Sequence, residues 1–67
     1  MDFQHNLNRL MDENYISNYR LGKEINVHAS TVAAWRNGKQ MPQILHLGKI
    51  ACFFGCKVEE LIGGDSE

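Results

Sequence analysis

Apolar residues recur along this 67-residue chain at intervals of three and four, the spacing that places side chains on one face of an α-helix. The first such run predicts a helix over residues 4–14, with an inner face formed by Phe3, Leu7, Leu10 and Met11. No segment shows a convincing alternation of apolar and polar residues, which is typical of a half-buried strand. The pattern therefore predicts an all-α fold.

Two short helices separated by a turn are predicted in the middle of the chain. Ser17 is a good N-cap for a helix over residues 18–25, and Asn26 tolerates the left-handed conformation that ends such a helix. The next helix is expected over residues 29–36. The apolar residues that pack these two helices are Leu21, Ile25, Val27, Val32 and Trp35.

Two further helices are predicted after a break in the chain. Gly38 is expected to end the helix over residues 29–36, and Pro42 then interrupts the chain. Gly55 separates a fourth helix from a short fifth one. Their defining apolar residues are Ile44, Leu47, Ile50, Ala51, Phe54, Val58, Leu61 and Ile62. We expect one domain over residues 6–62 and a flexible tail over residues 63–67.

The spacing of apolar residues over about 17–36 is that of a helix-turn-helix. The first helix must cross the second at a steep angle, so its inner face has to be small near the crossing, and Gly22 allows that close approach. The second helix is then held outward, and its N-terminal half can enter a DNA major groove about 12 Å wide.

Composition and charge narrow the class of protein. A hydrophobic content of 43% is enough for one compact core. The net charge of −1 argues against a nucleic-acid partner, but the charges are unevenly placed. Residues 17–40 carry four cations and one carboxylate, a local charge of +3, whereas residues 1–16 and 41–67 carry −2 each. The basic middle third is the segment of the predicted helix-turn-helix.

Cysteine and histidine offer little support for other chemistry. Cys52 and Cys56 are expected to be free thiols of a cytoplasmic protein, because the chain shows no signal peptide and no apolar run of about 18 residues that would cross a membrane. His46 with these cysteines suggests zinc, but no paired Cys-x-x-Cys or His-x-x-x-His motif completes a site. No cysteine nucleophile has a supporting motif. We expect no enzyme activity, no metal and no cofactor.

A family resemblance is carried by two stretches. They are ISNYRLGKEINVHASTVAAWRNGKQMP at residues 16–42 and LGKIACFFGCKVEELI at residues 47–62. In these residues the chain resembles the Cro and phage-repressor helix-turn-helix proteins, also called the xenobiotic-response-element (XRE) family. The resemblance covers roughly residues 6–62. It implies a compact five-helix, lambda-repressor-like DNA-binding domain, dimeric and involved in transcriptional control.

The resemblance also assigns candidate contacts with DNA. Asn18 is expected to touch a phosphate, the exposed side of the helix over residues 29–36 to face the bases, and Lys39 to contact the DNA backbone. The candidate DNA-binding residues are Asn18, Tyr19, His28, Ala29, Ser30, Thr31, Ala33, Ala34, Arg36, Asn37 and Lys39. The chain departs from the family at Asn26, where glycine is frequent, and at His28, where a serine or threonine cap is usual. Its base-facing positions also lack the glutamine, arginine or asparagine that typically reads bases.

Several of these residues have a second interpretation. Ala33 and Ala34 are also good helix formers on a solvated face, and Arg36 and Lys39 are also favourable cations at a helix C-terminus. Trp35 is expected in the core, with base stacking as the alternative.

We therefore expect a sequence-specific DNA-binding transcriptional regulator, a repressor of the phage or mobile-element kind, with residues 29–36 as its recognition helix. It is expected to bind a pseudo-palindromic operator as a homodimer joined through Phe53, Leu61 and Ile62. The alternative is a protein-interaction module on the same fold that binds DNA weakly or not at all.

Overall fold

The computed structural model describes residues 3–63, which form five α-helices and no strand. The helices are α1 (Phe3–Glu13), α2 (Asn18–Ile25), α3 (Ala29–Arg36), α4 (Ile44–Phe54) and α5 (Val58–Ile62). The predicted all-α class and the predicted order of helices are confirmed, with helix ends that differ by one residue or less where bounds were predicted. The predicted flexibility of residues 64–67 lies outside the described residues.

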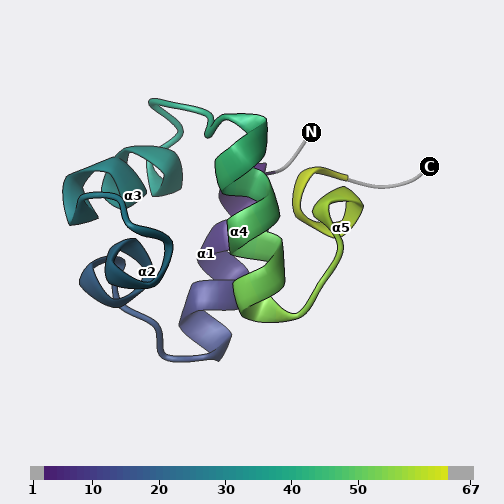
Figure 1. The fold of residues 1–67 in the computed structure, drawn as a ribbon, viewed down its shortest axis with the longest axis horizontal. Coiled ribbons are helices and arrows are strands. Elements are labelled where there is room, and N and C mark those ends of the chain that lie inside the picture. The colour runs from purple at the N-terminus through teal and green to yellow at the C-terminus, as the bar shows by residue number, and fades with distance from the viewer. Residues whose placement is uncertain (1–2, 64–67) are drawn as a thin grey trace.

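The helices surround one core (Figure 1). α2 packs on α3, α1 packs on α3 and α5, and α4 packs on α2 and α5. In Figure 1, α1 and α4 occupy the middle, with the pair α2–α3 on one side and α5 on the other. The helix-turn-helix therefore projects from one side of the bundle.

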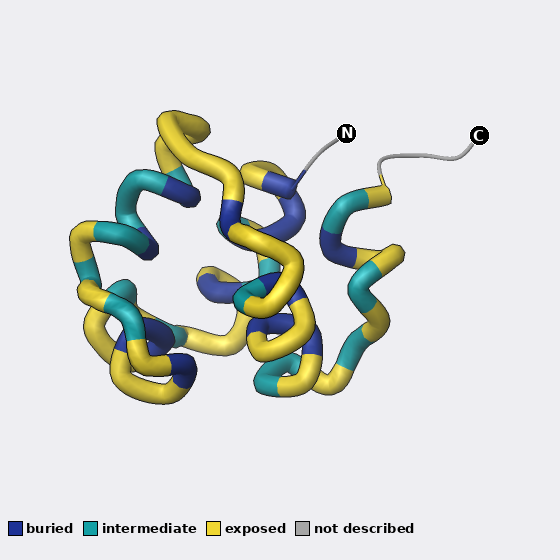
Figure 2. Tube along the Cα trace, turned by 45° about the horizontal axis from the view of Figure 1, so that its top comes forward, coloured by how far each residue is buried: buried dark blue, intermediate teal, exposed yellow. Residues whose placement is uncertain are grey.

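The core combines the inner faces of all five helices, and Figure 2 marks the buried positions along the Cα trace. The buried apolar residues are Phe3, Leu7, Met11, Leu21, Ile25, Val32, Trp35, Leu47, Ile50, Ala51 and Leu61. Phe3 is 2% exposed, so the packed unit begins before residue 6. The sequence predicted most of these positions, because each lies on the apolar face of an amphipathic helix.

Two sequence assignments are corrected by this core. Ile44, expected on the inner face of α4, is 84% exposed, because it is the first residue of the helix, at the end that meets the loop from α3. Leu61, expected at a dimer interface, is 0% exposed within a single chain. It has no surface left to offer a second copy, so that part of the interface prediction is wrong. Phe53 and Ile62 are half-buried against the core.

A buried polar side chain that the sequence did not predict joins the two ends of the described chain. Asn6 on α1 donates its side-chain Nδ2 to the carbonyl oxygens of Glu60, Leu61 and Gly63 at 3.2, 2.7 and 3.2 Å. These carbonyls lie at the C-terminal end of α5, where the last C=O groups receive no hydrogen bond from an N–H within the helix. Asn6 thus caps α5 from a residue 54 or more positions away.

Candidate nucleic-acid interface

The turn between α2 and α3 is held by local hydrogen bonds of the kind the sequence predicted. Ser17 accepts from the backbone N–H of Arg20 at 3.0 Å and caps α2. Asn26 adopts the left-handed conformation, with φ 66°, and the N–H of Val27 then donates to the carbonyl of Gly22 at 2.8 Å. This geometry fixes the angle at which α3 leaves α2.

Gly22 lies at the crossing of the two helices. A Cβ added at this position would lie 2.5 Å from the carbonyl oxygen of Val27 and 3.4 Å from the backbone nitrogen of Ala29. Only glycine lets α2 approach the start of α3 this closely. The predicted role of Gly22 is confirmed.

Helix α3 has one face in the core and one face at the surface. Val32 and Trp35 are buried, and Trp35 lies against the ring of His46 with centroids 5.7 Å apart. The core assignment of Trp35 is confirmed, so base stacking by this side chain is ruled out in the folded chain. None of the candidate DNA-binding residues is buried. The exposed ones are Tyr19, His28, Ser30, Asn37 and Lys39, and the half-buried ones are Asn18, Ala29, Thr31, Ala33, Ala34 and Arg36.

A shallow groove of about 430 Å³ runs between α2 and the first residue of α3. It is lined by Tyr19, Lys23, Val27, His28 and Ala29, three of which the sequence had assigned to DNA contact. Lys23 was not in that assignment. Two signals in the sequence point to it: it belongs to the basic middle third, and it follows Tyr19 by four residues on the same face of α2.

His28 occupies the N-cap of α3 in an extended conformation, and its side chain makes no capping hydrogen bond. A serine or threonine there would accept from the first turn of the helix. The N-terminal end of α3 therefore keeps backbone N–H groups that point outward, next to the groove lined by Tyr19 and Lys23.

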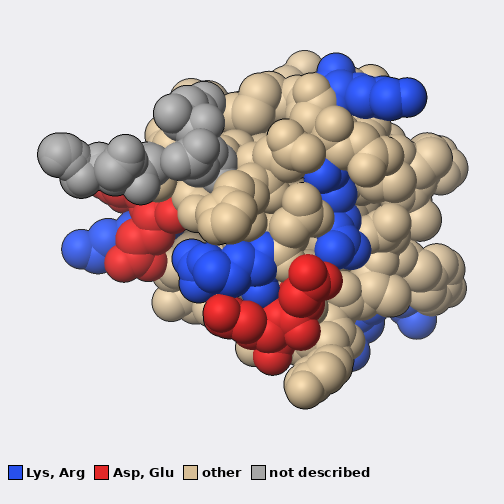
Figure 3. Space-filling model, turned by 180° about the vertical axis from the view of Figure 1, so that it is seen from behind, with Lys and Arg blue, Asp and Glu red and all other residues tan. Residues whose placement is uncertain are grey.

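The cations of the basic segment divide into paired and unpaired ones. Arg36 lies 3.0 Å from a carboxylate oxygen of Asp12, and Arg20 lies 3.2 Å from one of Glu24. Within residues 3–63, Lys23 and Lys39 make no ion pair. On the face shown in Figure 3, acidic side chains lie beside some of the basic ones, and other basic side chains stand apart from them. Two of the four cations of residues 17–40 are thus already paired with carboxylates. Fewer positive charges are available to a DNA phosphate than the local charge of +3 suggests.

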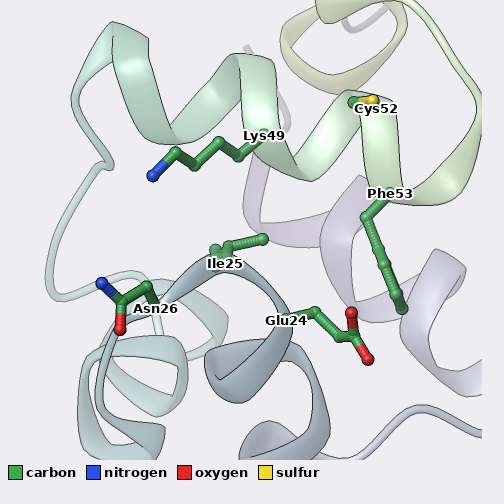
Figure 4. A pocket seen from close by; sticks show the side chains of 6 residues that line it. All are labelled: Glu24, Ile25, Asn26, Lys49, Cys52 and Phe53. Carbon is green, nitrogen blue, oxygen red and sulfur yellow. The ribbon is translucent and has the colours of Figure 1, made fainter.

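A second groove, of about 360 Å³, lies between the end of α2 and α4. Figure 4 shows Phe53 extending from α4 toward Glu24 of α2, and Cys52 and Lys49 also line the groove. Its lining contains none of the candidate DNA-binding residues.

The two cysteines are free thiols, with Cys52 exposed and Cys56 half-buried. Burial raises the pKa of the Cys56 thiol, and the Glu60 carboxylate adds to the rise, so the thiol is protonated at neutral pH and weakly nucleophilic. Among residues 3–63, no three histidine, cysteine or acidic side chains are grouped closely enough to hold a metal ion.

No helix within the described part of the chain is both long enough and apolar enough to cross a membrane.

Together these features define a protein of the helix-turn-helix class, in which residues 3–63 form five helices and α3 has one face at the surface. The profile of the Cro/C1-type helix-turn-helix DNA-binding domain matches residues 6–65, and the chain belongs to this family. The resemblance seen in the sequence is confirmed.

One solved structure is closely similar to this chain. The crystal structure of a transcriptional regulator from Listeria innocua superposes with a TM-score of 0.90, at 33% sequence identity. The match covers 98% of this chain and 62% of that regulator, so the chain spans less than two thirds of it. No curated protein matches the chain in sequence.

Proposed function

We propose that this protein is a sequence-specific DNA-binding transcriptional regulator that places α3 in the major groove. The observation that carries the proposal is the contact at Gly22, since it holds α3 with Val32 and Trp35 inward and its opposite side at the surface. An α-helix presented in this way fits a groove about 12 Å wide. The family membership and the similar Listeria innocua regulator support the same function.

Base recognition by this helix would depend on small side chains. The methyl groups of Ala29 and Ala34 suit contact with a thymine methyl, and the Ser30 hydroxyl can donate or accept one hydrogen bond. Such contacts discriminate weakly, so contacts with phosphates would supply much of the affinity. Repression is the simplest mode of action, because a domain bound across a promoter denies that DNA to other proteins.

The experiment that tests the proposal is selection of bound duplexes from a random pool, followed by titration of the selected site with salt. Enrichment of one sequence, and a steep fall of the binding constant with salt concentration, would support sequence-specific DNA binding. A chain that enriches no sequence and shows no salt-dependent binding would contradict it.

Lys39→Ala is expected to weaken binding to all duplexes about equally and to lower the salt slope by about 0.9, the contribution of one phosphate contact. The physical reason is that Lys39 is exposed, follows α3 and makes no ion pair within residues 3–63. Binding curves over a range of salt concentrations measure the slope. Lys57→Ala, which removes an exposed cation at the start of α5, is the control and should leave the slope unchanged. A Lys39 variant that alters sequence preference at constant slope would refute the phosphate contact.

A protein-interaction module is the second candidate function. The reading side of α3 carries no long hydrogen-bonding side chain, and the acidic segments flank the basic one. Both features suit a protein partner better than they suit most operators. Failure of the selection experiment would favour this candidate.

We further propose that the regulator binds a pseudo-palindromic site as a two-fold dimer, with half-site centres about 34–36 Å apart. Each copy of α3 would then contact one half-site, so the weak base contacts of a single helix would be made twice. Phe53 and Ile62 remain the proposed contact residues, because both keep part of their apolar surface exposed.

Phe53→Ser is expected to raise the dissociation constant of the dimer by about tenfold or more, since aromatic residues at an interface carry much of its energy. Sedimentation velocity over a range of concentrations measures this change. Ile44→Ser is the matched control, because Ile44 is exposed, apolar and on the same helix, but at its other end. A dimer that is lost in the Ile44 variant and kept in the Phe53 variant would move the interface to the start of α4. A chain that stays monomeric and binds single half-sites as well as inverted repeats would contradict the dimer.

A further inference from the structure

The side chain of Arg36 connects α3 to both of the helices that precede it. Its Nε donates to Asn8 Oδ1 at 2.6 Å, its Nη1 donates to Asn18 Oδ1 at 2.9 Å, and its Nη2 donates to Asp12 Oδ1 at 3.0 Å. The side chain is 23% exposed. The guanidinium is thus directed toward α1 and the start of α2, although the sequence placed Arg36 among the candidate DNA-binding residues.

The main chain of Arg36 is held by the same helix α1. Its carbonyl oxygen accepts from Gln4 Nε2 at 3.0 Å and from Asn8 Nδ2 at 3.1 Å. Asn8 therefore accepts from the guanidinium with one end of its amide and donates to the carbonyl with the other. This two-point contact fixes where Arg36 lies at the end of α3.

The contact with Asn18 determines which way the amide of that side chain faces. A guanidinium can only donate, so the atom that faces Arg36 must be the carbonyl oxygen of Asn18. The Nδ2 group, with its two N–H bonds, is consequently turned away from Arg36. No residue within 3–63 accepts a hydrogen bond from it.

The direction of this amide matters because of where Asn18 lies. It is the first residue of α2, after the Ser17 cap, where the backbone N–H groups of Asn18 and Tyr19 have no acceptor within the helix. An Nδ2 donor beside them suits one anionic oxygen such as that of a phosphate. Within residues 3–63, the bond from Arg36 is the only hydrogen bond that the Asn18 side chain makes. Without it, the whole side chain can turn away to solvent and lose its place beside the phosphate.

We propose that Arg36 is a positioning residue for DNA binding: it holds the Asn18 amide with its N–H2 group outward, so that Asn18 donates to a DNA phosphate. Arg36 itself neutralises Asp12 rather than the DNA. This inference rests on the proposed DNA-binding function. It replaces the direct phosphate contact of Arg36 with an indirect one through Asn18.

The test is a double-mutant cycle on the selected duplex, using Asn18→Ala and Arg36→Lys. Lysine keeps the positive charge beside Asp12, but a single ammonium group cannot reproduce the fork that contacts Asn8, Asp12 and Asn18 together. We expect Asn18→Ala to weaken binding by about tenfold in the parent chain and by less than about twofold beside Arg36→Lys. Arg36→Lys alone should weaken binding by up to about tenfold and leave the salt slope unchanged.

A purely structural role of Arg36 predicts a different result, in which Asn18→Ala costs the same factor in both backgrounds. A direct phosphate contact predicts that Arg36→Lys keeps most of the affinity. Either result would overturn the inference.

Arg36→Met repeats the cycle without the charge, should the lysine variant melt early in circular dichroism. Lys39→Ala combined with Asn18→Ala is the control pair, whose effects should multiply. A parent chain without salt-dependent DNA binding would instead contradict the proposed function itself, before any variant is compared.

Discussion

Trp35→Ala is expected to lower the melting temperature of the domain by about 12 °C or more. The indole is 2% exposed in a core shared by all five helices, and removing a buried tryptophan costs about 3–5 kcal/mol in the free energy of unfolding. A domain of this length has roughly 3–10 kcal/mol of stability in total, at about 0.05–0.15 kcal/mol per residue. The substitution therefore removes about a third or more of the free energy of unfolding.

Thermal and urea unfolding followed by circular dichroism measure this effect. Tyr19→Ala is the matched control, because it removes an aromatic ring that is 70% exposed, and it should change the free energy of unfolding by no more than about 0.5 kcal/mol. A melting temperature of the Trp35 variant within a few degrees of the parent would show that the indole is not part of the core.

Gly22→Ala is expected to destabilise the chain by about 1–3 kcal/mol, the usual cost of forcing an extra carbon into a packed site. The new Cβ would lie 2.5 Å from the carbonyl oxygen of Val27, a backbone atom that cannot rotate out of the way. The helices α2 and α3 must move apart to accommodate it. We therefore expect the folded variant to bind DNA more weakly as well, because α3 no longer leaves α2 at the same angle. The binding constant is compared after correction for the unfolded fraction.

Gly48→Ala provides the matched control for this prediction. Gly48 lies inside α4, and a Cβ there would meet no atom within 4 Å. Alanine is favoured over glycine inside a helix by about 0.5–1 kcal/mol, so this variant should gain stability. Urea titrations of both variants give the two free energies. If Gly22→Ala were as stabilising as Gly48→Ala, the close approach at the turn would be refuted.

The helices and their ends were predictable because the interactions that set them are local. Ser17 caps α2 by accepting from the N–H of Arg20, three residues along the chain. Asn26 ends the helix with a left-handed backbone conformation that few residues adopt. Gly55 does the same for α4, with φ 73°. Tyr15 also has a positive φ, of 56°, and the sequence did not indicate it, because tyrosine has no preference for that conformation.

The face of each helix was predictable, but the extent of its burial was less so. Periodicity places Ile44 and Leu47 on the same side of α4, yet one is exposed and the other buried. Periodicity describes direction around a helix axis and says nothing about where along that axis a neighbouring helix stops. The same limit explains Leu61, whose complete burial depends on contacts between α1, α4 and α5.

The candidate interface was predictable in its helix and turn, and less so in its charges. The spacing of Gly22, Val32 and Trp35 was sufficient to identify the helix-turn-helix and the buried side of α3, because a helix fixes these relations within about a dozen residues. The partners of Arg36 are Asn8, Asp12 and Asn18, which lie 28, 24 and 18 positions away. A charge count treats Arg36 as available to DNA, whereas the packing of α1 against α3 brings Asp12 to it. Hydrogen bonds and ion pairs act over a few ångströms, so their partners are set by which helices meet, and a chain position alone does not contain that information.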